Sequence, residues 1–173
     1  MLEPLMLMMA LHAPTDPQPS PSPSREAASA RPNRGLPRSP EFAAAHSRLA
    51  RDLHGALPSL YRGRYYLAAQ ETFRRCVAQR EGRFTYNVIG GGGGLYQTTY
   101  QFRDGAWRRG LTFMMASESR ITHDGLRAEA RALIRKPMAQ WGRYWIDRAF
   151  YTALNYNGAW SGRHHWDGGR WSC

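Results

Sequence analysis

Cysteine is scarce in this chain of 173 residues, because only Cys76 and Cys173 occur. Two cysteines are too few for a disulfide scaffold or for a zinc module with several cysteine ligands. Lysine is scarcer still, since Lys136 is the only one and the other cationic side chains are all arginines. No apolar run approaches the ~20 residues that cross a bilayer, so the sequence predicts no transmembrane helix.

Aromatic residues are nearly absent from the first third of the chain. Residues 1–60 contain ten of the eleven prolines and a single aromatic residue, Phe42, whereas all six tryptophans come later. Six basic and five acidic residues precede residue 61, and eighteen basic and eight acidic residues follow it. The later part has enough apolar side chains for a core. We therefore expect one folded, basic domain over residues 58–173.

The first 13 residues resemble a weak secretion signal. An apolar stretch, LMLMMAL, covers residues 5–11, and Ala13 is a suitable residue for cleavage. Against this, Glu3 precedes the stretch and no basic residue occurs before Arg25. The segment is either a signal peptide, a flexible hydrophobic start of the chain, or the product of a misassigned start codon.

Residues 14–57 are predicted to form a proline-rich tether. Residues 14–40 lack apolar side chains to bury, and their prolines cannot donate backbone hydrogen bonds, which favours a disordered, extended, polyproline-like chain. Within the tether, apolar residues at spacings of three or four predict a short amphipathic helix over residues 41–55. Gly55 and Pro58 would end it.

Later parts of the domain show helical periodicity. Apolar residues recur at every fourth position over residues 65–81, which predicts a helix with Gly82 as its C-terminal cap. Asp104 and Asp124 are each followed by apolar residues at helical spacing, so both are predicted N-terminal caps. An aromatic helix is predicted over residues 141–156, where large apolar residues keep the same spacing.

Between the first two of these helices the period changes to two. Apolar residues alternate over residues 84–88 and again over residues 96–102, on either side of the run Gly90–Gly94. This pattern predicts a hairpin-like excursion around a flexible glycine tip. The expected fold is therefore mainly α, with one small β-hairpin.

Glu81 is the unusual residue of the first long helix. Burial at the end of an apolar stripe and the negative end of the helix dipole both favour a protonated carboxyl, which a general acid needs. Arg80 and Arg83 favour the ionised form instead. The simpler interpretation is a helix-end residue paired with a nearby arginine.

Three short motifs resemble bacterial lysozyme-like cell-wall enzymes. CVAQREGR (76–83) resembles the start of such domains, where a helix ends in glutamate. GLYQ (94–97) resembles an element of soluble lytic transglycosylases, while YQF (100–102) with Trp107 resembles that of resuscitation-promoting factors. ALNYNG (153–158) is similar to the element that closes the transglycosylase site. The motifs follow one another in the family's order.

This resemblance implies a lysozyme-like catalytic domain acting on the β-1,4 glycan strand of peptidoglycan. It implies that Glu81 is the acid/base, although Gly82 stands where the family usually has serine. The glycan-contacting residues that it implies are Tyr96, Gln97 or Gln101 on one side, and Tyr156 with Asn157 on the opposite wall.

Most glycosidases use two carboxylates, and Asp104 and Glu118 are the nearest candidates for a second one. Neither lies in a family motif, and the resemblance implies a single acid as in lytic transglycosylases. Cys76 and Cys173 are either free thiols or one bridge. The bridge is favoured because similar actinobacterial domains carry a comparable one, and Cys76 is expected on the buried side of its helix.

No cofactor is predicted. His164, His165 and Asp167 lack the spacing of zinc ligands, so no metal site is expected, and the glycine run lacks the Lys-Ser/Thr of a phosphate-binding loop. The leading hypothesis is a monomeric lytic transglycosylase or muramidase, bacterial or phage-encoded, that is secreted or associated with the cell wall. The alternatives are a non-catalytic wall-binding relative and a basic nucleic-acid-binding protein, although no nucleic-acid motif is present.

Overall fold

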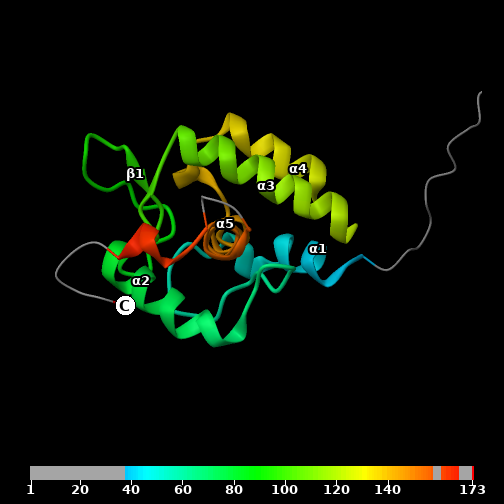
Figure 1. The fold of residues 1–173 in the computed structure, drawn as a ribbon, viewed down its shortest axis with the longest axis horizontal. Coiled ribbons are helices and arrows are strands. Elements are labelled where there is room, and N and C mark those ends of the chain that lie inside the picture. The colour runs from blue at the N-terminus through cyan, green and yellow to red at the C-terminus, as the bar shows by residue number, and fades with distance from the viewer. Residues whose placement is uncertain (1–37, 158–160, 168–172) are drawn as a thin grey trace, which may run out of the picture. The chain divides into compact units, whose positions relative to one another are not determined.

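The computed structural model describes residues 38–157, 161–167 and 173. The signal-like segment 1–13 and the tether up to residue 37 lie outside the described residues. Over the described residues the fold is mainly helical, as the sequence predicts, with five α-helices and one pair of short antiparallel strands (Figure 1). These elements are α1 Pro40–Ala45, α2 Glu71–Gly82, β1 Tyr96–Gln97, β2 Phe102–Arg103, α3 Ala106–Thr122, α4 Arg127–Ala132 and α5 Arg143–Asn155.

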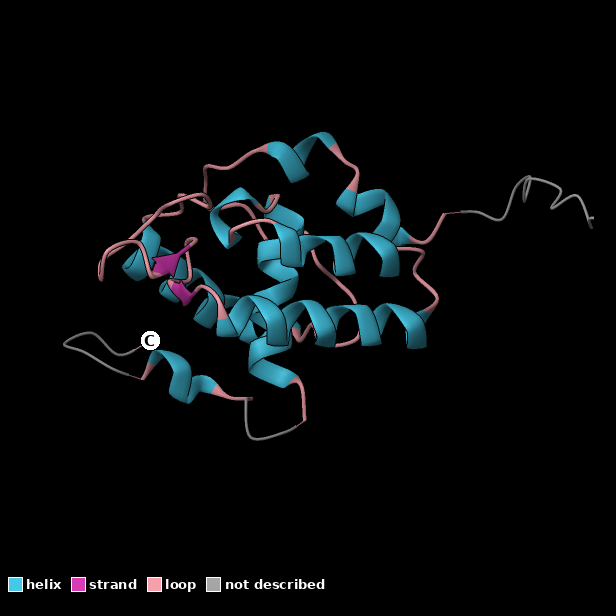
Figure 2. Ribbon diagram, turned by 90° about the horizontal axis from the view of Figure 1, so that it is seen from above, coloured by secondary structure: helices cyan, strands magenta, loops and turns pink. Residues whose placement is uncertain are grey.

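Helix α5 lies at the centre of the described part. Every residue of α5 except Asn155 is buried, which confirms the aromatic helix predicted near residues 141–156. In Figure 1 α5 is seen end-on, while α3 and α4 run side by side across the view. Figure 2 shows the two strands at one end of the helical part. No helix of the described residues is long and apolar enough to cross a membrane.

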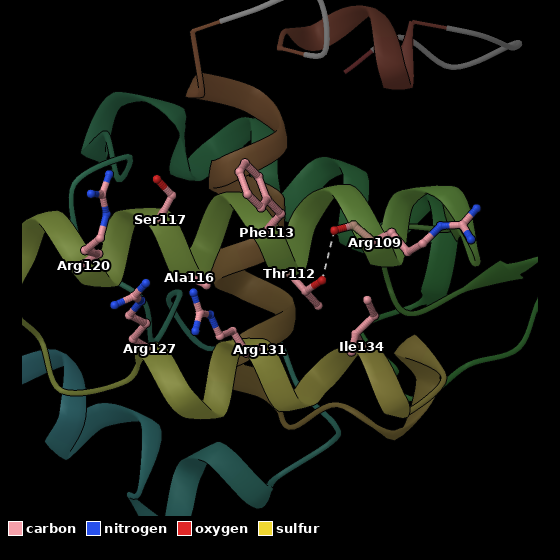
Figure 3. Close-up of a pocket in the computed structure, with 9 residues that line it drawn as sticks. All are labelled: Arg109, Thr112, Phe113, Ala116, Ser117, Arg120, Arg127, Arg131 and Ile134. Atoms are coloured by element: carbon pink, nitrogen blue, oxygen red, sulfur yellow. Dashed lines mark hydrogen bonds between the residues drawn. The ribbon is translucent and has the colours of Figure 1, made fainter. Parts of the chain in front are cut away.

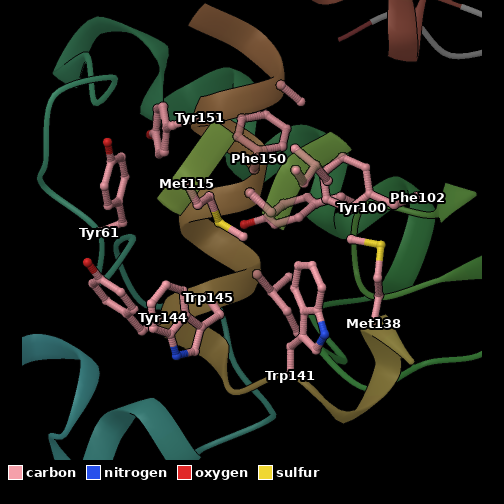
Figure 4. Packing of buried hydrophobic residues seen from close by; sticks show 14 of the residues in the cluster. Tyr61, Tyr100, Phe102, Met115, Met138, Trp141, Tyr144, Trp145, Phe150 and Tyr151 are labelled. Carbon is pink, nitrogen blue, oxygen red and sulfur yellow. The ribbon is translucent and has the colours of Figure 1, made fainter. Parts of the chain in front are cut away.

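Large aromatic side chains on α5 and around it form much of the core (Figure 4). The rings of Tyr100 and Phe150 lie 4.5 Å apart between their centroids, and those of Phe150 and Trp166 lie 4.6 Å apart. Burial of this apolar surface is the main favourable contribution to folding. Most of the aromatic residues after residue 60 therefore belong to the core.

A charged cluster is enclosed within this aromatic core. Asp147 of α5 and Arg74 of α2 have no exposed side-chain surface, and Asp147 Oδ1 lies 3.5 Å from Arg74 Nη1. The same oxygen accepts hydrogen bonds from the hydroxyls of Tyr86 (2.9 Å) and Tyr100 (2.7 Å). Burial, and then the charge of Asp147, raise the pKa of Tyr100 well above its usual value, so the hydroxyl remains a donor. The cluster joins α2, the strand region and α5.

A second buried ion pair joins α3 to α5. Glu118, 1% exposed, accepts a hydrogen bond from Arg148 Nε at 2.9 Å, and Tyr61 donates its hydroxyl to the other carboxylate oxygen. Arg148 Nη2 also lies 3.0 Å from Asp124 Oδ2. Burial, together with the charge of Glu118, raises the pKa of Tyr61 far above its usual value. Glu118 is therefore a structural carboxylate.

The folded unit begins well before residue 58, contrary to the predicted boundary. Glu41 accepts hydrogen bonds from the Tyr144 hydroxyl (2.7 Å) and from the backbone N–H of Arg62 (3.1 Å). The carbonyl oxygen of Leu57 accepts from the buried guanidinium groups of Arg74 (3.0 Å) and Arg143 (2.8 Å). Residues 38–57 are thus part of the packed domain, because their polar groups satisfy buried side chains of α2 and α5.

The single amphipathic helix predicted over residues 41–55 is wrong in detail. Helix α1 ends at Ala45, and a separate 3₁₀ helix covers Arg48–Arg51. Two serines cap these helices separately, since Ser39 Oγ accepts from the N–H of Phe42 and Ser47 Oγ accepts from that of Ala50. The second cap begins a new helix where the periodicity alone predicts a continuous one.

The limits of α2 also differ from the prediction. The helix begins at Glu71 rather than at residue 65, because a 3₁₀ turn over Ala68–Gln70 precedes it. Its cap is Arg83, in the left-handed conformation at φ +48°, whereas Gly82 is the last helical residue. Gly82 instead allows close packing, because a Cβ there would collide with the backbone of Thr99.

The two predicted aspartate caps take other roles. Gly105 precedes α3 at the cap position, while Asp104 accepts from the N–H of Met138 at 3.4 Å and lies 3.6 Å from Arg108. Asp124 Oδ1 accepts at 2.9 Å from the N–H of Leu126, which precedes the first residue of α4. Of the two aspartates, only Asp124 therefore accepts a backbone hydrogen bond at the start of the predicted helix, which is α4.

The predicted hairpin is present but its pairing is different. Strands β1 and β2 pair Tyr96 with Arg103 and Gln97 with Phe102, so the tight turn covers residues 98–101. The glycine run lies between Ile89 and β1, and Ile89 forms an isolated antiparallel bridge with Gln97 of β1. The residues on both sides of the glycine loop thus meet, as predicted, but the regular strands lie after it.

Removal of residues 1–57 is expected to lower the melting temperature by more than about 10 °C or to prevent folding. The truncation removes both the Glu41 contacts and the Leu57 carbonyl that satisfies two buried arginines. Removal of residues 1–37 is the matched control, because it leaves these contacts in place. Equal melting temperatures of the two truncated chains, measured by circular dichroism, would contradict the assigned domain start.

The substitution Asp147→Asn is expected to destabilise the fold by about 3–5 kcal/mol, because among the described residues it leaves buried Arg143 without a counter-charge and leaves Arg74 with Glu71 alone. Denaturant unfolding measures the change, and Asp167→Asn, at an exposed position, is the control with a change within about 0.5 kcal/mol. A loss below about 1 kcal/mol in Asp147→Asn would show that the cluster is not a main contributor to stability.

Candidate active site

A disulfide joins Cys76 of α2 to Cys173, with the Cα atoms 5.7 Å apart. The favoured bridge is thus present, but Cys76 lies on the exposed side of α2, not the buried side, because Phe73, Arg74 and Val77 occupy the face toward the core. The bridge attaches the end of the chain to the outer side of α2. Disulfides of this kind are typical of extracellular or other oxidising compartments.

Trp166 attaches the C-terminal segment to the core. Its side chain is 5% exposed, and its indole N–H donates to the carbonyl of Tyr100 at 3.0 Å. Its own carbonyl accepts from Arg80 Nη2 at 2.7 Å. The short 3₁₀ helix Arg163–Trp166 therefore lies against both the end of α2 and the strand region.

A hollow of about 310 Å³ opens where these three segments meet. An adjoining hollow of about 180 Å³ shares most of its lining with the first, so the two form one continuous depression, here named the Glu81 groove. Its lining comprises Glu81, Tyr96, Tyr100, Gln101, Phe102, Arg103, Trp107, His165 and Trp166. Glu81 is the only carboxylate among these residues.

The carboxylate of Glu81 is held by its neighbour in the sequence. Its side chain is 28% exposed, and Oε1 accepts a hydrogen bond from Arg80 Nε at 2.8 Å. Because Arg80 also donates to the carbonyl of Trp166, it links the candidate acid to the C-terminal segment. Glu81 is thus oriented and still reachable from solvent.

The structure distinguishes the two glutamines that fit the family motif. Gln97 is 8% exposed, and its amide accepts from the N–H of Ala139 (2.9 Å) and donates to the carbonyl of Gly94 (3.2 Å). Gln101 lines the Glu81 groove, and Gly90 makes room for it, because a Cβ at Gly90 would collide with its amide. Gln101 therefore lies at the groove, with its amide nitrogen donating to the carbonyl of Thr98 at 2.9 Å, whereas Gln97 is packed against backbone groups.

Tyr96 lies in the groove, but Tyr156 and Asn157 are not among its lining residues. The ring of Tyr156 packs on that of Tyr65, with 5.7 Å between centroids. The preceding Asn155 exchanges hydrogen bonds with Gln70, just before α2, whereas Glu81 lies at the other end of that helix, roughly 16 Å away along its axis.

Neither candidate for a second carboxylate lines the groove. Glu118 is enclosed with Arg148 between α3 and α5, and Asp104 contacts Arg108 and the backbone of Met138. Within the described ranges, no three His, Cys, Asp or Glu side chains lie close enough together to hold a metal ion. The described lining residues supply one carboxyl group together with aromatic, amide, imidazole and guanidinium side chains.

Sequence reasoning missed His165 and Trp166 as lining residues. The ring of His165 stands edge-on to Trp107, 4.6 Å between centroids. No local pattern marks either residue, because their position depends on the packing of Trp166 and on the disulfide rather than on a helix or strand period.

Comparison with known proteins finds no matching family model, no matching curated protein and no matching solved structure.

Gln97→Ala is expected to lower stability by about 1–3 kcal/mol, because it leaves the N–H of Ala139 without its acceptor. Gln101→Ala is the matched variant and is expected to cost less than about 1 kcal/mol, since its amide lies at the groove. Urea unfolding of both variants provides the comparison. The reverse order of stabilities would exchange the roles assigned to the two glutamines.

Proposed function

We propose that this protein is a peptidoglycan-cleaving enzyme with a lysozyme-like domain, and that Glu81 is its single acid/base. The observation that carries the proposal is the lining of the Glu81 groove, in which one accessible carboxylate faces aromatic side chains and an amide. The resemblance of the three motifs to lysozyme-like enzymes supports the same substrate, the β-1,4 glycan strand.

The groove has the chemical character that a glycan requires. Tyr96 is 43% exposed, and Trp107 lies at the far end, so aromatic faces are available for the C–H surfaces of pyranose rings. Gln101 offers donors and acceptors for hydroxyl or acetamido groups. Two adjoining hollows suit a polymer that continues beyond the cleaved bond.

In the proposed reaction Glu81 donates its proton to the glycosidic oxygen while the bond from that oxygen to the anomeric carbon breaks. The resulting carboxylate then accepts a proton from the hydroxyl that attacks the anomeric carbon, so one group serves as acid and then as base. The hydrogen bond from Arg80 orients the carboxyl oxygen that it contacts.

The attacking hydroxyl distinguishes two types of enzyme. A second carboxylate normally activates water or forms a covalent intermediate in a glycosidase. Because Glu81 is the only carboxylate among the described lining residues, the proposal favours attack by O6 of the same N-acetylmuramic acid residue, as in a lytic transglycosylase. Attack by water would make the protein a muramidase.

A non-catalytic wall-binding role is the second candidate. The observation that favours it is the 2.8 Å contact between Arg80 and Glu81, together with Gly82 in the place of the family's serine. A carboxylate engaged with a guanidinium can bind a glycan without cleaving it. Under either function the excess of arginine suits an anionic cell wall, and the disulfide suits a site outside the cytoplasm.

Glu81→Gln is expected to lower the rate of peptidoglycan cleavage by about 10²–10⁴-fold, because it keeps the shape of the side chain and removes the proton donor. Turbidity loss of purified peptidoglycan gives the rate, and co-sedimentation shows that binding persists. Asp104→Asn is the matched control, expected within a few-fold of the unsubstituted protein. Activity of Glu81→Gln close to that of this control would remove Glu81 from the mechanism.

Mass analysis of the soluble fragments identifies the nucleophile. Attack by O6 gives 1,6-anhydro ends, which are lighter by one water than the reducing ends that hydrolysis gives. Reducing N-acetylmuramic acid ends alone would establish a muramidase. Peptidoglycan binding by the unsubstituted protein without release of any fragment would reject catalysis in favour of the second candidate.

A further inference from the structure

A separate hollow of about 400 Å³ lies between α3 and α4, on a face that the proposed reaction does not use (Figure 3). Arg109 and Arg120 contribute to its lining from α3, and Arg127 and Arg131 contribute from α4. Figure 3 shows Arg127 and Arg131 extending from α4 toward α3. A neighbouring hollow of about 560 Å³ shares Arg120, Arg127 and Arg131, so these three cations border both spaces.

Among the described residues, the arginines on this face have no carboxylate as a counter-charge. In the described part of the chain, no carboxylate lies within 4.0 Å of any of the four guanidinium groups, whereas other arginines pair with Asp or Glu. Arg127 and Arg131 are four residues apart on one helix, a spacing at which like charges destabilise. Their arrangement therefore creates a concentrated positive charge that an anion would neutralise.

The same face exposes large apolar side chains. Phe113 is 72% exposed and Ile134 is 44% exposed, and both line the hollow beside the arginines. A small anion such as phosphate would use the cations alone. A ligand with an anionic group and an apolar part would use both kinds of side chain.

We propose that the α3–α4 face binds an anionic phospholipid at a membrane surface. The phosphate lies between Arg120, Arg127 and Arg131, because guanidinium groups make paired, charge-assisted hydrogen bonds to phosphate oxygens. The upper part of an acyl chain contacts Phe113 and Ile134. A cluster of cations next to exposed apolar side chains is the pattern by which peripheral proteins bind anionic bilayers.

Such binding leaves the Glu81 groove accessible. Successive residues of a helix are rotated by about 100°, which places Phe113 roughly 120° and Arg120 roughly 140° around α3 from Trp107. Trp107 lines the groove, whereas Phe113 and Arg120 line the α3–α4 hollow. One face of α3 thus belongs to the glycan site of the proposed function, and a different face belongs to the lipid site. The lipid proposal itself does not depend on cleavage.

Co-sedimentation of the full chain with vesicles tests the proposal. Vesicles of phosphatidylglycerol and phosphatidylcholine should bind the protein, and vesicles of phosphatidylcholine alone should not. The double variant Arg127→Gln/Arg131→Gln should bind these anionic vesicles about 30-fold more weakly, because each cation removed lowers the affinity roughly fivefold. The matched control Arg51→Gln/Arg75→Gln removes the same net charge from exposed positions elsewhere and should bind almost as the unsubstituted protein does.

Two further variants separate the alternatives. Phe113→Ser should weaken binding to the anionic vesicles severalfold, and Glu81→Gln should leave it unchanged. Equal losses in the two arginine double variants would show non-specific attraction and would overturn the proposal. Full binding by Phe113→Ser, with displacement from vesicles by millimolar inorganic phosphate, would indicate a site for free phosphate and would likewise overturn it. Equal binding to vesicles of both compositions would also contradict it.

Discussion

The carboxylate of Asp147 is the interaction on which the arrangement of the domain depends. It lies without exposed surface among Arg74, Arg143 and the hydroxyls of two tyrosines, and its second oxygen accepts from the N–H of Leu60 at 2.9 Å. Transfer of such charges from water is costly, and the cost is offset only when each charge finds partners with good geometry. Those partners come from α2, α5, the strand region and the segment before α2, so the cluster specifies how these parts meet.

The Glu81 groove is a consequence of that arrangement. Arg74 fixes the orientation of α2, which carries Glu81 two turns after Arg74. Arg74 also donates a hydrogen bond to the hydroxyl of Tyr100, which precedes Gln101 in the turn between the two strands. Trp166 then covers the same region and donates its indole N–H to the carbonyl of Tyr100. The disulfide restrains the end of the chain nearby and adds to stability mainly by limiting the unfolded chain. Glu81 is thus positioned by the packing of α2, the strand region and Trp166.

The basic charge of the chain has two different structural roles. Arg74, Arg143 and Arg148 are buried and serve as partners of carboxylates inside the domain. The arginines of the α3–α4 face are exposed and have no such partners in the described ranges, so their charge is available to a ligand. Net charge alone cannot separate these roles. In a protein that cleaves a wall polymer with one face and binds an anionic surface with another, the buried arginines would support the fold and the exposed arginines would contact the anionic surface.

Local sequence determined the features that depend on short-range periodicity. The spacing of apolar residues predicted α5 and most of α2, and it placed Glu81 at a helix end, because helical repeats are set by neighbours within a few turns. The tertiary structure decided what depends on contacts between distant residues. The contact between Leu57 and Arg74 shows that the domain starts before the predicted residue 58. Contacts between distant residues also place His165 in the groove.

The two motif glutamines show why the sequence could not decide the rest. In a regular strand, residues 97 and 101 would lie on the same face, since side chains alternate with a period of two. Thr98 and Gln101 instead adopt positive φ angles of +72° and +51° in the turn between β1 and β2, which breaks the alternation. Gln97 therefore points inward to the backbone of Ala139, and Gln101 lines the groove. Such a turn is stabilised by the packing around it, which only the folded chain supplies.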